Sequence, residues 1–251
     1  MTATACVTVS ISRTKGSAPR EQGAVMHVFA HGQNGSIGGG ALEYSAIQIA
    51  RDILAGKASD QSRDFPLGPA LGQCCGGAVT LDFRSGHDTA PAPQTDLWIW
   101  GAGHVGRAIA STLAPLDAFN ITLIDTHAAR LPDPLPPQVT PLIAQDPARV
   151  IPHAPPNAAH LILTYSHDID FALCHGLLTH GARQIGLIGS ATKWARFQRR
   201  LDALGHSSEE IARIRCPIGD PSLGKHPQAI AIGVAAVMIA QNDTTTREHL
   251  A

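Results

Sequence analysis

The stretch Leu97-Trp98-Ile99-Trp100-Gly101-Ala102-Gly103-His104-Val105-Gly106 decides the fold of the second half of this 251-residue chain. Its apolar beginning predicts a strand over 96–100, and the apolar spacing after the glycines predicts a helix over 104–116. In such a strand–turn–helix, Gly101 makes the tight turn, Gly103 admits a phosphate, and Gly106 lets the helix pack on the strand. The free N–H groups at the helix start then favour an anion. The stretch therefore indicates a Rossmann-like fold.

An acidic residue stands where a dinucleotide-binding domain would place one. Asp125 ends the next predicted strand, 120–125, twenty-four residues after Gly101. An acid at that place can bind the hydroxyl groups of a ribose. NAD is therefore a candidate cofactor, and a nicotinamide-dependent oxidoreductase is one candidate function. The alternative is a Rossmann scaffold that keeps its turn glycines for packing alone, because fold does not determine function.

The rest of the second half alternates strands with helices. Further strands are predicted at 139–143, 159–165 and 184–189, and further helices at 168–179, 191–204 and 227–240. This alternation predicts a mostly parallel, doubly wound sheet. The last helix is apolar on nearly every side, so we expect it to be packed on most sides.

Polar residues directly follow two of these strands. His167 and Asp168 come after the strand that ends at Tyr165, at the edge where open α/β sheets bind ligands. Asp168 is equally suited to cap the helix that follows. Lys193 follows the next strand, where it either reaches an anion or is solvated. No metal-ligand spacing is diagnostic here, so the metal content is left unknown.

A polar, proline-containing stretch separates the two halves of the chain. We interpret 87–95 as a linker between an N-terminal domain at 1–86 and the Rossmann-like domain at 96–243. In the first domain, strands are predicted at 5–12, 24–30 and 78–83, and a helix follows the run Gly38-Gly39-Gly40. These elements predict a small α/β domain.

Two adjacent cysteines lie between glycines in Gly72-Gln73-Cys74-Cys75-Gly76-Gly77. Neighbouring side chains of an extended chain point to opposite faces, so the pair is poorly suited to hold a structural metal. The flanking glycines, Gly76 and Gly77 among them, allow the backbone to approach a ligand closely. We interpret the segment as thiols that contact a ligand. The alternative is two small buried apolar residues.

Two further loops of the first domain suit an anionic ligand. Arg20, in the polar loop 14–23, can bind a phosphate through two hydrogen bonds, or it is an ordinary solvated arginine. A cation there could also raise the reactivity of the cysteine pair. Gly39 and Gly40 can form an anion-binding nest at a helix start. Glu43 then belongs to that site, or it is simply an acid that the first helical turn favours.

Composition excludes several classes of function. A net charge of −1 removes the electrostatic case for binding nucleic acid or an anionic membrane. The longest apolar stretch, 229–240, is shorter than the ~20 residues of a membrane span. The first residues do not resemble a signal peptide, and five cysteines without disulfide-like spacing fit a reducing compartment. We therefore expect a cytoplasmic protein that binds neither nucleic acid nor membrane.

Taken together, these motifs resemble those of the xanthine dehydrogenase accessory proteins of the XdhC/CoxI family, over nearly the whole chain. The Gly-Gln-Cys-Cys-Gly-Gly stretch is highly specific, whereas the Rossmann turn by itself is not. The motifs that carry the resemblance are Gly16–Arg20, Gly38–Glu43, Gly72–Gly77, Gly101–Gly106, His167–Asp170, Leu187–Ser190 and Cys216–Gly219. Two segments, 132–156 and 220–224, look individual to this chain.

The resemblance implies an accessory protein rather than an enzyme, so no catalytic residue is expected. Such proteins bind the molybdenum cofactor, a molybdopterin, as cargo. They assist the replacement of an oxo ligand by sulfur with a cysteine desulfurase, and they deliver the product to xanthine dehydrogenase. The expected partners are thus the molybdenum-binding subunit of xanthine dehydrogenase and a cysteine desulfurase. Apart from the resemblance, we also expect the chain to form a homo-oligomer.

The residue types agree with that implication. Molybdopterin carries a phosphate and a soft, dithiolene-bound metal, which suit anion-binding glycine loops and accessible thiols. As a hypothesis, Cys74 or Cys75 contacts the cofactor or its sulfur, and Arg20 with the glycine loops holds the phosphate. A third class, a metal-binding redox sensor built on the two cysteines, also stays open.

Overall fold

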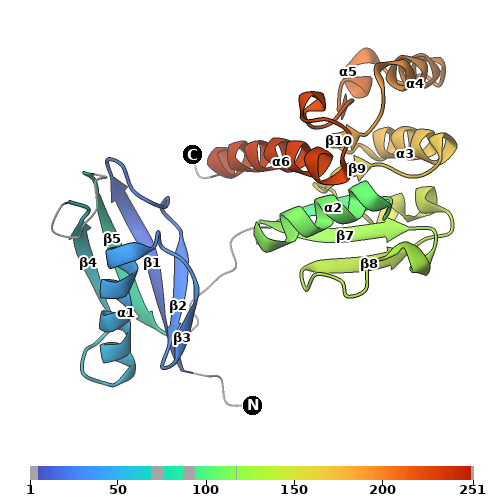
Figure 1. Cartoon of the computed structure of the whole chain (residues 1–251). Coiled ribbons are helices and arrows are strands. Elements are labelled where there is room, and N and C mark those ends of the chain that lie inside the picture. The colour runs from blue at the N-terminus through green and yellow to red at the C-terminus, as the bar shows by residue number, and fades with distance from the viewer. Residues whose placement is uncertain (1–4, 69–75, 87–93, 117, 250–251) are drawn as a thin grey trace. The chain divides into compact units, whose positions relative to one another are not determined.

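The computed structural model describes residues 5–68, 76–86, 94–116 and 118–249. The chain divides into two compact units, Met1–Pro91 and Ala92–Ala251 (Figure 1). The expected cysteine pair, Cys74 and Cys75, lies outside the described residues, as does most of the expected linker. Each unit is described by itself.

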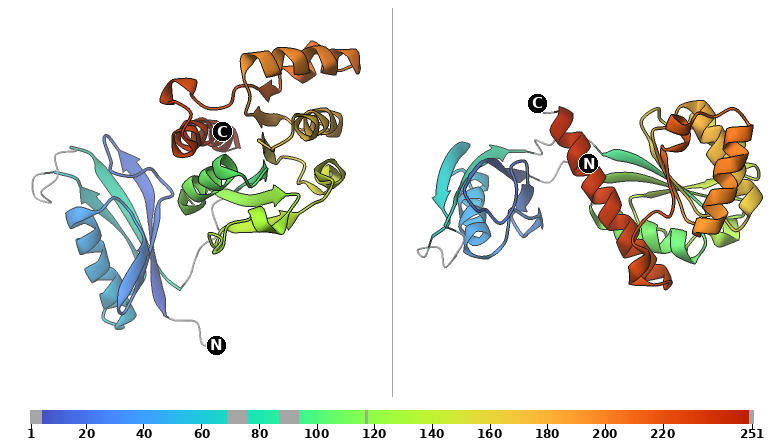
Figure 2. Two further views of the ribbon diagram at one scale, coloured as in Figure 1. Left: turned by 45° about the vertical axis from the view of Figure 1, so that its right-hand side comes forward. Right: turned by 90° about the horizontal axis from the view of Figure 1, so that it is seen from above.

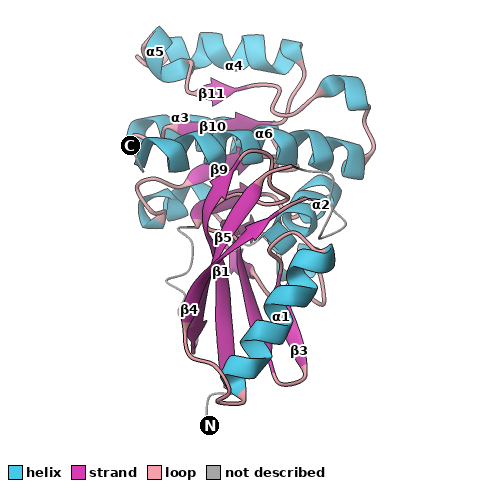
Figure 3. Cartoon of the chain, turned by 90° about the vertical axis from the view of Figure 1, so that its left-hand side faces the viewer, coloured by secondary structure: helices cyan, strands magenta, loops and turns pink. Residues whose placement is uncertain are grey.

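The first unit is an antiparallel sheet covered on one face by a helix (Figure 3). Its strand order is β3-β2-β1-β5-β4. The strands are β1 (Cys6–Lys15), β2 (Val25–Phe29), β3 (Gly32–Gly35), β4 (Gln61–Pro66) and β5 (Ala78–Ser85), and the helix is α1 (Gly40–Leu54).

The core of the first unit lies between one face of the sheet and one face of α1. Alternate residues of β1, among them Val9 and Ile11, point to the helix because a strand repeats every two residues. Leu42, Ala46 and Ala50 of α1 face them at helical spacing and are fully buried. The small α/β domain expected at 1–86 therefore has its own hydrophobic core.

The second unit is a six-stranded parallel sheet with the order β11-β10-β9-β6-β7-β8. Every pairing in it is parallel. The strands are β6 (Thr95–Trp100), β7 (Phe119–Asp125), β8 (Val139–Ile143), β9 (Ala159–Ile162), β10 (Gln184–Leu187) and β11 (Ile214–Arg215). The order reverses between β6 and β9, which makes their carboxyl ends the switch point where such sheets bind ligands.

Helices cover both faces of this sheet (Figure 2). Leu97 and Ile99 of β6 belong to the core on the side of α2 and α6, whereas Trp98 and Trp100 belong to the core on the side of α3 and α4. The helices are α2 (His104–Leu113), α3 (His167–His180), α4 (Ala191–Ala203), α5 (Ser208–Ile211) and α6 (Pro227–His249). The Rossmann-like, doubly wound sheet predicted from the sequence is confirmed.

Short connecting elements complete the second unit. Short 3-10 helices follow α2, β7 and β8 and precede α6. They are η2 (Ala114–Leu116), η3 (Ala128–Arg130), η4 (Pro147–His153) and η5 (Pro221–Leu223). Within the segment 132–156, residues 139–143 form the predicted strand β8 and residues 147–153 form η4.

Three strands were not predicted because they carry little apolar pattern. β3 is exposed throughout, β4 buries only Phe65, and β11 has two residues. Backbone pairing with a neighbouring strand, rather than alternation in the sequence, defines these elements.

The last helix differs from its prediction in length and in burial. α6 continues to His249, and it buries Ala231, Val234 and Met238 against the sheet and α2. Its opposite side leaves Ile232 58% exposed and Ile239 40% exposed. The expectation of packing on most sides is therefore met on one side only, because the rest of the second unit lies on that side. Among the described residues, no helix has both the length and the apolar character that crossing a membrane requires.

Candidate functional site

Two glycines of the Rossmann turn are required by packing. Gly101 has φ of +117°, and a Cβ there would lie 2.5 Å from the carbonyl oxygen of Leu163. A Cβ on Gly106 would collide with the carbonyl oxygen of Gly101. These two positions need glycine whether or not a ligand binds.

The third glycine, Gly103, is not required by packing. Gly103 has φ of −67° and ψ of −174°, an extended conformation that any residue adopts. A Cβ built on it would meet nothing within 4 Å. The space beside Gly103, at the start of α2, is open to a group that approaches the backbone closely, as a phosphate does.

The carboxylate of Asp125 forms hydrogen bonds within the protein. It is buried, and its Oδ2 accepts a hydrogen bond from the Ala102 N–H at 2.8 Å. Its Oδ1 accepts from the Thr126 N–H at 2.7 Å. The carboxylate therefore holds the glycine turn against the end of β7, which is a structural role that the sequence did not predict.

The space next to Asp125 is nearly closed. The Arg130 Nε lies 3.8 Å from its Oδ1, and the guanidinium carbon is 4.4 Å from the ring centre of Tyr165. The cavity that Asp125 lines with Tyr165 has a volume of about 10 Å³. That is room for about one water molecule, so a ribose would enter only if these side chains moved.

His167 and Asp168 lie in the first turn of α3, and both are exposed. The helix cap is Ser166, whose Oγ accepts from the Ile169 N–H. The interpretation of Asp168 as the cap was wrong, because the chain is already helical at His167. Asp168 is still favoured there as an acid in the first turn. The Nδ1 atom of His167 lies 3.3 Å from Nη2 of Arg196.

A buried ion pair next to this turn was missed by the sequence reasoning. Nζ of Lys193 lies 2.6 Å from Oδ2 of Asp170, and the two side chains are 8% and 1% exposed. Oδ1 of Asp170 accepts from the backbone N–H and the hydroxyl of Thr164, and Lys193 donates also to the Ile188 carbonyl. Lys193 is therefore neither solvated nor free for an external anion.

A sequence signal for this pair existed. Asp170 shares a helix face with Cys174 and Leu177, which are fully buried. A charged residue within an apolar face is rarely buried unless it is paired. The partner, however, follows twenty-three residues later, and only the tertiary structure identifies it.

The described cysteines are packed rather than reactive. Burial raises the pKa of the Cys216 thiol to about 11, and its Sγ lies 3.8 Å from the Gly189 carbonyl oxygen, to which it donates. Burial also raises the pKa values of Cys6 and Cys174. These thiols are protonated at neutral pH, so the nucleophilic or metal-binding thiolate form is scarce among them.

In the first unit, the structure describes both ends of the loop that carries Cys74 and Cys75, which we call the cysteine loop. Leu67 and Gly77 close it: the Leu67 N–H donates to the Gly77 carbonyl, and the Gly76 N–H donates to the Leu67 carbonyl. Gly76 also forms a β-bridge with Ser17. A Cβ on Gly77 would lie 2.6 Å from the carbonyl oxygen of Lys15. The loop that carries Cys74 and Cys75 therefore leaves and re-enters the fold beside the loop of Arg20.

The glycine run meets the same loop. Gly38 has φ of +122°, and a Cβ there would lie 2.5 Å from Cγ of Pro19. Pro19 precedes Arg20, whose side chain is exposed. Three motifs that are far apart in the sequence thus converge at one end of the first unit. They are the Arg20 loop, the Gly38–Gly40 run and the base of the cysteine loop.

Glu43 supports this end of the unit from within. Its Oε1 accepts from the hydroxyl of Ser36 at 2.5 Å and from the N–H groups of Ile37 and Gly38. Partial burial alone would raise the pKa of Glu43, but these hydrogen bonds and one from Gly39 outweigh it and lower the pKa. The carboxylate therefore fills part of the nest that was expected for an external anion. Gly39 and Gly40, both at positive φ, lead from it into α1.

Two candidate sites result, one in each unit. The described residues contain no group of three His, Cys, Asp or Glu side chains arranged to hold a metal ion. The first site is the convergence of loops around the cysteine loop, and the second is the open turn at Gly103.

Two family profiles match this chain. The XdhC Rossmann domain matches residues 97–238, and the XdhC and CoxI family matches residues 2–64. The first match alone covers more than half of the chain. The chain belongs to the XdhC family. The resemblance inferred from the motifs is thereby confirmed.

Individual relatives agree with this assignment. The XdhC-family chain is 32% identical over 236 residues to an Escherichia coli K12 protein, YqeB, which is described as uncharacterized. The match covers 90% of this chain and 41% of YqeB, so this chain spans less than half of that relative.

A solved structure shares the fold. A Bacillus halodurans protein, described as a xanthine dehydrogenase, superposes with a TM-score of 0.80 at 19% identity, over 97% of this chain and 93% of that one. A Rossmann-fold NAD(P)-binding protein from Shigella flexneri reaches a TM-score of 0.36 over 45% of this chain and 64% of its own length, at 16% identity. That second likeness is too weak to bear on function.

Proposed function

We propose that this XdhC-family protein is an accessory protein that carries the molybdenum cofactor. It binds the cofactor as cargo, assists its sulfuration by a cysteine desulfurase, and passes it to the molybdenum-binding subunit of xanthine dehydrogenase. It acts in the cytoplasm and catalyses no reaction of its own.

The convergence of three loops in the first unit carries this proposal. The loop of Cys74 and Cys75 begins and ends beside the loop of Arg20, and Gly38 contacts Pro19 of that same loop. A molybdopterin has a phosphate at one end and a dithiolene-bound metal at the other. Arg20 suits the phosphate. The N–H of Gly40 at the start of α1 suits it too, whereas the N–H groups of Ile37, Gly38 and Gly39 already donate to Glu43. The cysteine pair supplies soft sulfur ligands for the metal or for its sulfur.

The other thiols are unsuited to that role. Cys6, Cys174 and Cys216 all have raised pKa values because they are buried. The adjacent pair is therefore the part of the chain to which we assign the sulfur chemistry.

The test measures cofactor binding and transfer separately. The full chain is loaded with molybdenum cofactor released from a molybdoenzyme, and bound pterin is measured by its fluorescence after oxidation. Cys74→Ser and Cys75→Ser are expected to weaken binding about tenfold or more, as the loss of one good contact does. Activation of apo xanthine dehydrogenase should fall with it.

Cys216→Ser is the matched control, because that thiol is packed against Gly189 and lies outside the proposed site. It should bind the cofactor as the unchanged protein does. If a Cys74→Ser/Cys75→Ser double variant bound and delivered the cofactor normally, the assignment to the cysteine pair would be wrong.

A nicotinamide-dependent oxidoreductase is the second candidate, and the open space at Gly103 favours it. Asp125 argues against it, since its oxygens already hold Ala102 and Thr126. Titration of the protein into NADH distinguishes the two functions. An enhancement of NADH fluorescence that saturates, together with turnover of a substrate, would support the oxidoreductase.

A further inference from the structure

One face of α6 is apolar and uncovered within the second unit. Ile232, Ala236 and Ile239 are all exposed, and their spacing of four and three residues places them on one line along the helix. We call this line the α6 ridge. A helix that is apolar on all sides normally lies inside a protein, so a ridge of this kind indicates a missing neighbour.

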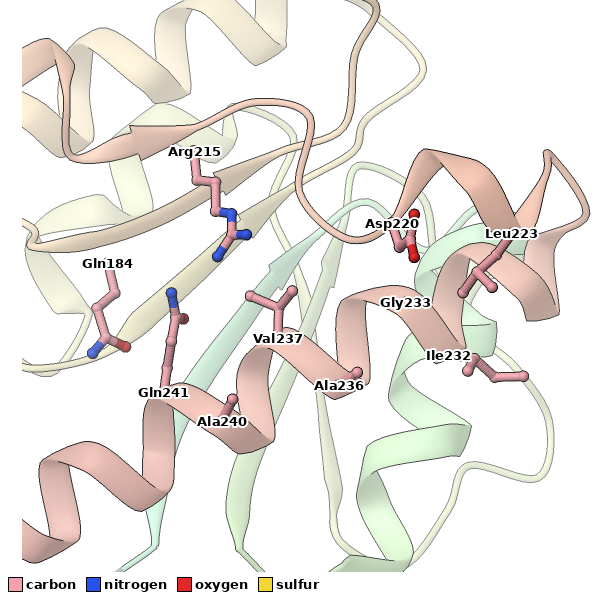
Figure 4. Close-up of a pocket in the computed structure, with 10 residues that line it drawn as sticks. All are labelled: Gln184, Arg215, Asp220, Leu223, Ile232, Gly233, Ala236, Val237, Ala240 and Gln241. Atoms are coloured by element: carbon pink, nitrogen blue, oxygen red, sulfur yellow. The ribbon is translucent and has the colours of Figure 1, made fainter.

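A hollow of about 630 Å³ runs along the ridge (Figure 4). It separates α6 from β11 and from the turn before α6. Its walls are mostly aliphatic, and its lining residues include Leu223, Ile232, Gly233, Ala236, Val237 and Ala240. The hollow is large enough to take the side chains of a second apolar ridge.

The two ends of the hollow carry opposite charges. Arg215 lies at the end where α6 reaches Gln241, and Asp220 lies at the other end, beside Gly233 (Figure 4). Both side chains are exposed, and neither has an ion-pair partner among the described residues. The centre of the ridge, Ala236, is small and lies between the two charged ends.

We propose that a second copy of this chain docks on this surface, with the two α6 helices antiparallel about a twofold axis near Ala236. A twofold interface must be complementary to itself. The antiparallel arrangement places Arg215 against Asp220 of the partner subunit, and by symmetry it does so twice. It also lays the ridge of each copy into the hollow of the other, as ridges pack into grooves between helices.

The charge pattern favours this occupant over others. A strongly acidic partner would be attracted by Arg215 but repelled by Asp220. A strongly basic partner would be attracted by Asp220 but repelled by Arg215. A surface with one charge of each sign on either side of an apolar centre matches its own copy turned by half a revolution. The apolar centre then supplies the affinity, and the charged ends set the direction.

The first experiment measures the mass of the full chain in solution by sedimentation or light scattering over a range of concentrations. The unchanged protein is expected to be a dimer. Ile232→Glu should weaken dimerisation about a thousandfold, because each dimer carries the charged substitution twice within the apolar part of the interface. Far-UV circular dichroism should show that the variant remains folded, since Ile232 is exposed in the single unit.

Ile143→Glu is the matched control. Ile143 is an exposed isoleucine on β8, at the opposite edge of the same sheet. This variant should remain a dimer. A protein that is monomeric at every concentration, or a dimer that Ile232→Glu leaves intact, would overturn the proposal.

The second experiment tests the direction of the helices. Arg215→Asp places two carboxylates together at each end of the antiparallel interface, and Asp220→Arg places two guanidinium groups together. Each variant alone should therefore dimerise more weakly than the unchanged protein, by about tenfold or more. An equal mixture can form a dimer from one copy of each variant. In that dimer one copy is acidic at both positions 215 and 220 and the other is basic at both, so both contacts between the copies become attractive.

The mixture should thus form a dimer with one copy of each variant, which native mass spectrometry identifies. This recovery cannot arise within one chain, because neither variant alone contains both changes. A mixture that stays as weakly associated as its components would overturn the antiparallel arrangement.

Discussion

The three glycines of the Rossmann turn are alike in sequence but are required for different reasons. Gly101 needs its positive φ, and Gly106 leaves room for the carbonyl of Gly101. Gly103 is neither strained nor crowded. The sequence pattern predicted the turn at Gly101 and the close packing at Gly106, and the structure agrees with both. The phosphate at Gly103 stays a prediction, and only the packing shows that the fold itself does not need that glycine.

Substitution by alanine should separate these roles. Gly106→Ala is expected to lower the free energy of unfolding by about 2 kcal/mol or more, because its Cβ collides with backbone. Gly103→Ala should leave the free energy of unfolding within about 0.5 kcal/mol, since its Cβ enters open space. Urea denaturation of the two variants measures both.

The same pair tests the second candidate site. If a phosphate-bearing ligand binds at the turn, Gly103→Ala should lower the affinity for that ligand although the fold is intact. A Gly103→Ala variant that is as destabilised as Gly106→Ala would contradict the open space seen beside α2.

His160 is expected to make stability depend on pH. It is buried in the centre of the sheet, and its Nδ1 accepts a hydrogen bond from Nε1 of Trp100 at 3.3 Å. Burial, with a smaller contribution from His180, lowers its pKa from 6.5 to about 4. Between these values the unfolded chain binds a proton that the folded chain does not. The contribution of His160 to the free energy of unfolding is therefore fully present above about pH 6.5 and is lost as the pH falls towards 4.

Between pH 7 and pH 5 this effect should remove about 2 kcal/mol from the free energy of unfolding. Denaturation at both pH values measures it, with His160→Asn as the comparison. The variant starts from a lower stability, but its loss between the two pH values should be smaller by that amount. Equal losses in both proteins would mean that His160 is protonated without penalty in the folded state.

At the scale of elements, the buried ion pair joins two helices to two strand ends. Asp170 of α3 holds Thr164 after β9, and Lys193 of α4 holds Ile188 after β10. These contacts fix the carboxyl edge of the sheet on the side of α3 and α4. Removing one member leaves the other charge buried without a partner, which is strongly unfavourable.

Lys193→Met is therefore expected to lower the free energy of unfolding by about 3–5 kcal/mol. Asp170→Asn should do the same, and the double variant should lose less than the sum of the two because no buried charge remains. Arg149→Met is the control, since its ion pair with Asp146 is exposed and should contribute less than about 1 kcal/mol. Additive losses in the double variant would argue against a coupled pair.

The elements themselves were predictable to different degrees. The strands β6 and β7 and the helix α2 follow from runs of apolar residues and from the glycine turn. The short strands β3 and β11 were missed, because they exist through pairing with a neighbour and have little apolar pattern of their own. The helix cap at Ser166 was missed because Asp168 is an equally good capping residue in sequence.

At the scale of the whole molecule, the two units have separate hydrophobic cores. The core of the first unit contains no residue beyond Phe83, and the two cores of the second unit begin at Leu97. Gly86 still belongs to the first unit, since its N–H donates to the Cys6 carbonyl. A break after Gly86 and before β6 therefore cuts no core.

Fragments 1–86 and 94–251 are accordingly expected to fold independently. Each should give a cooperative urea transition and the far-UV spectrum of its share of the whole chain. A fragment 1–66 is the control: it lacks β5, which pairs with both β1 and β4, and it should stay unfolded. A fragment 94–251 without a cooperative transition would show that the second unit depends on the first.

The sequence by itself determined the class of each unit, the Rossmann turn and the family, because these depend on contiguous residues. A glycine turn between strand and helix, or Gly-Gln-Cys-Cys-Gly-Gly, is recognisable wherever it occurs. The separation of the chain into a small domain and a parallel sheet also follows from local periodicity.

Only the tertiary structure decided which of these residues meet. It assigned Asp125 to the turn, paired Asp170 with Lys193, and brought the Arg20 loop into contact with both the base of the cysteine loop and Gly38. It also left the α6 ridge uncovered in a helix that the sequence shows as apolar on nearly every side. The physical reason is that burial and pairing depend on contacts between residues far apart in the chain, which no local pattern records.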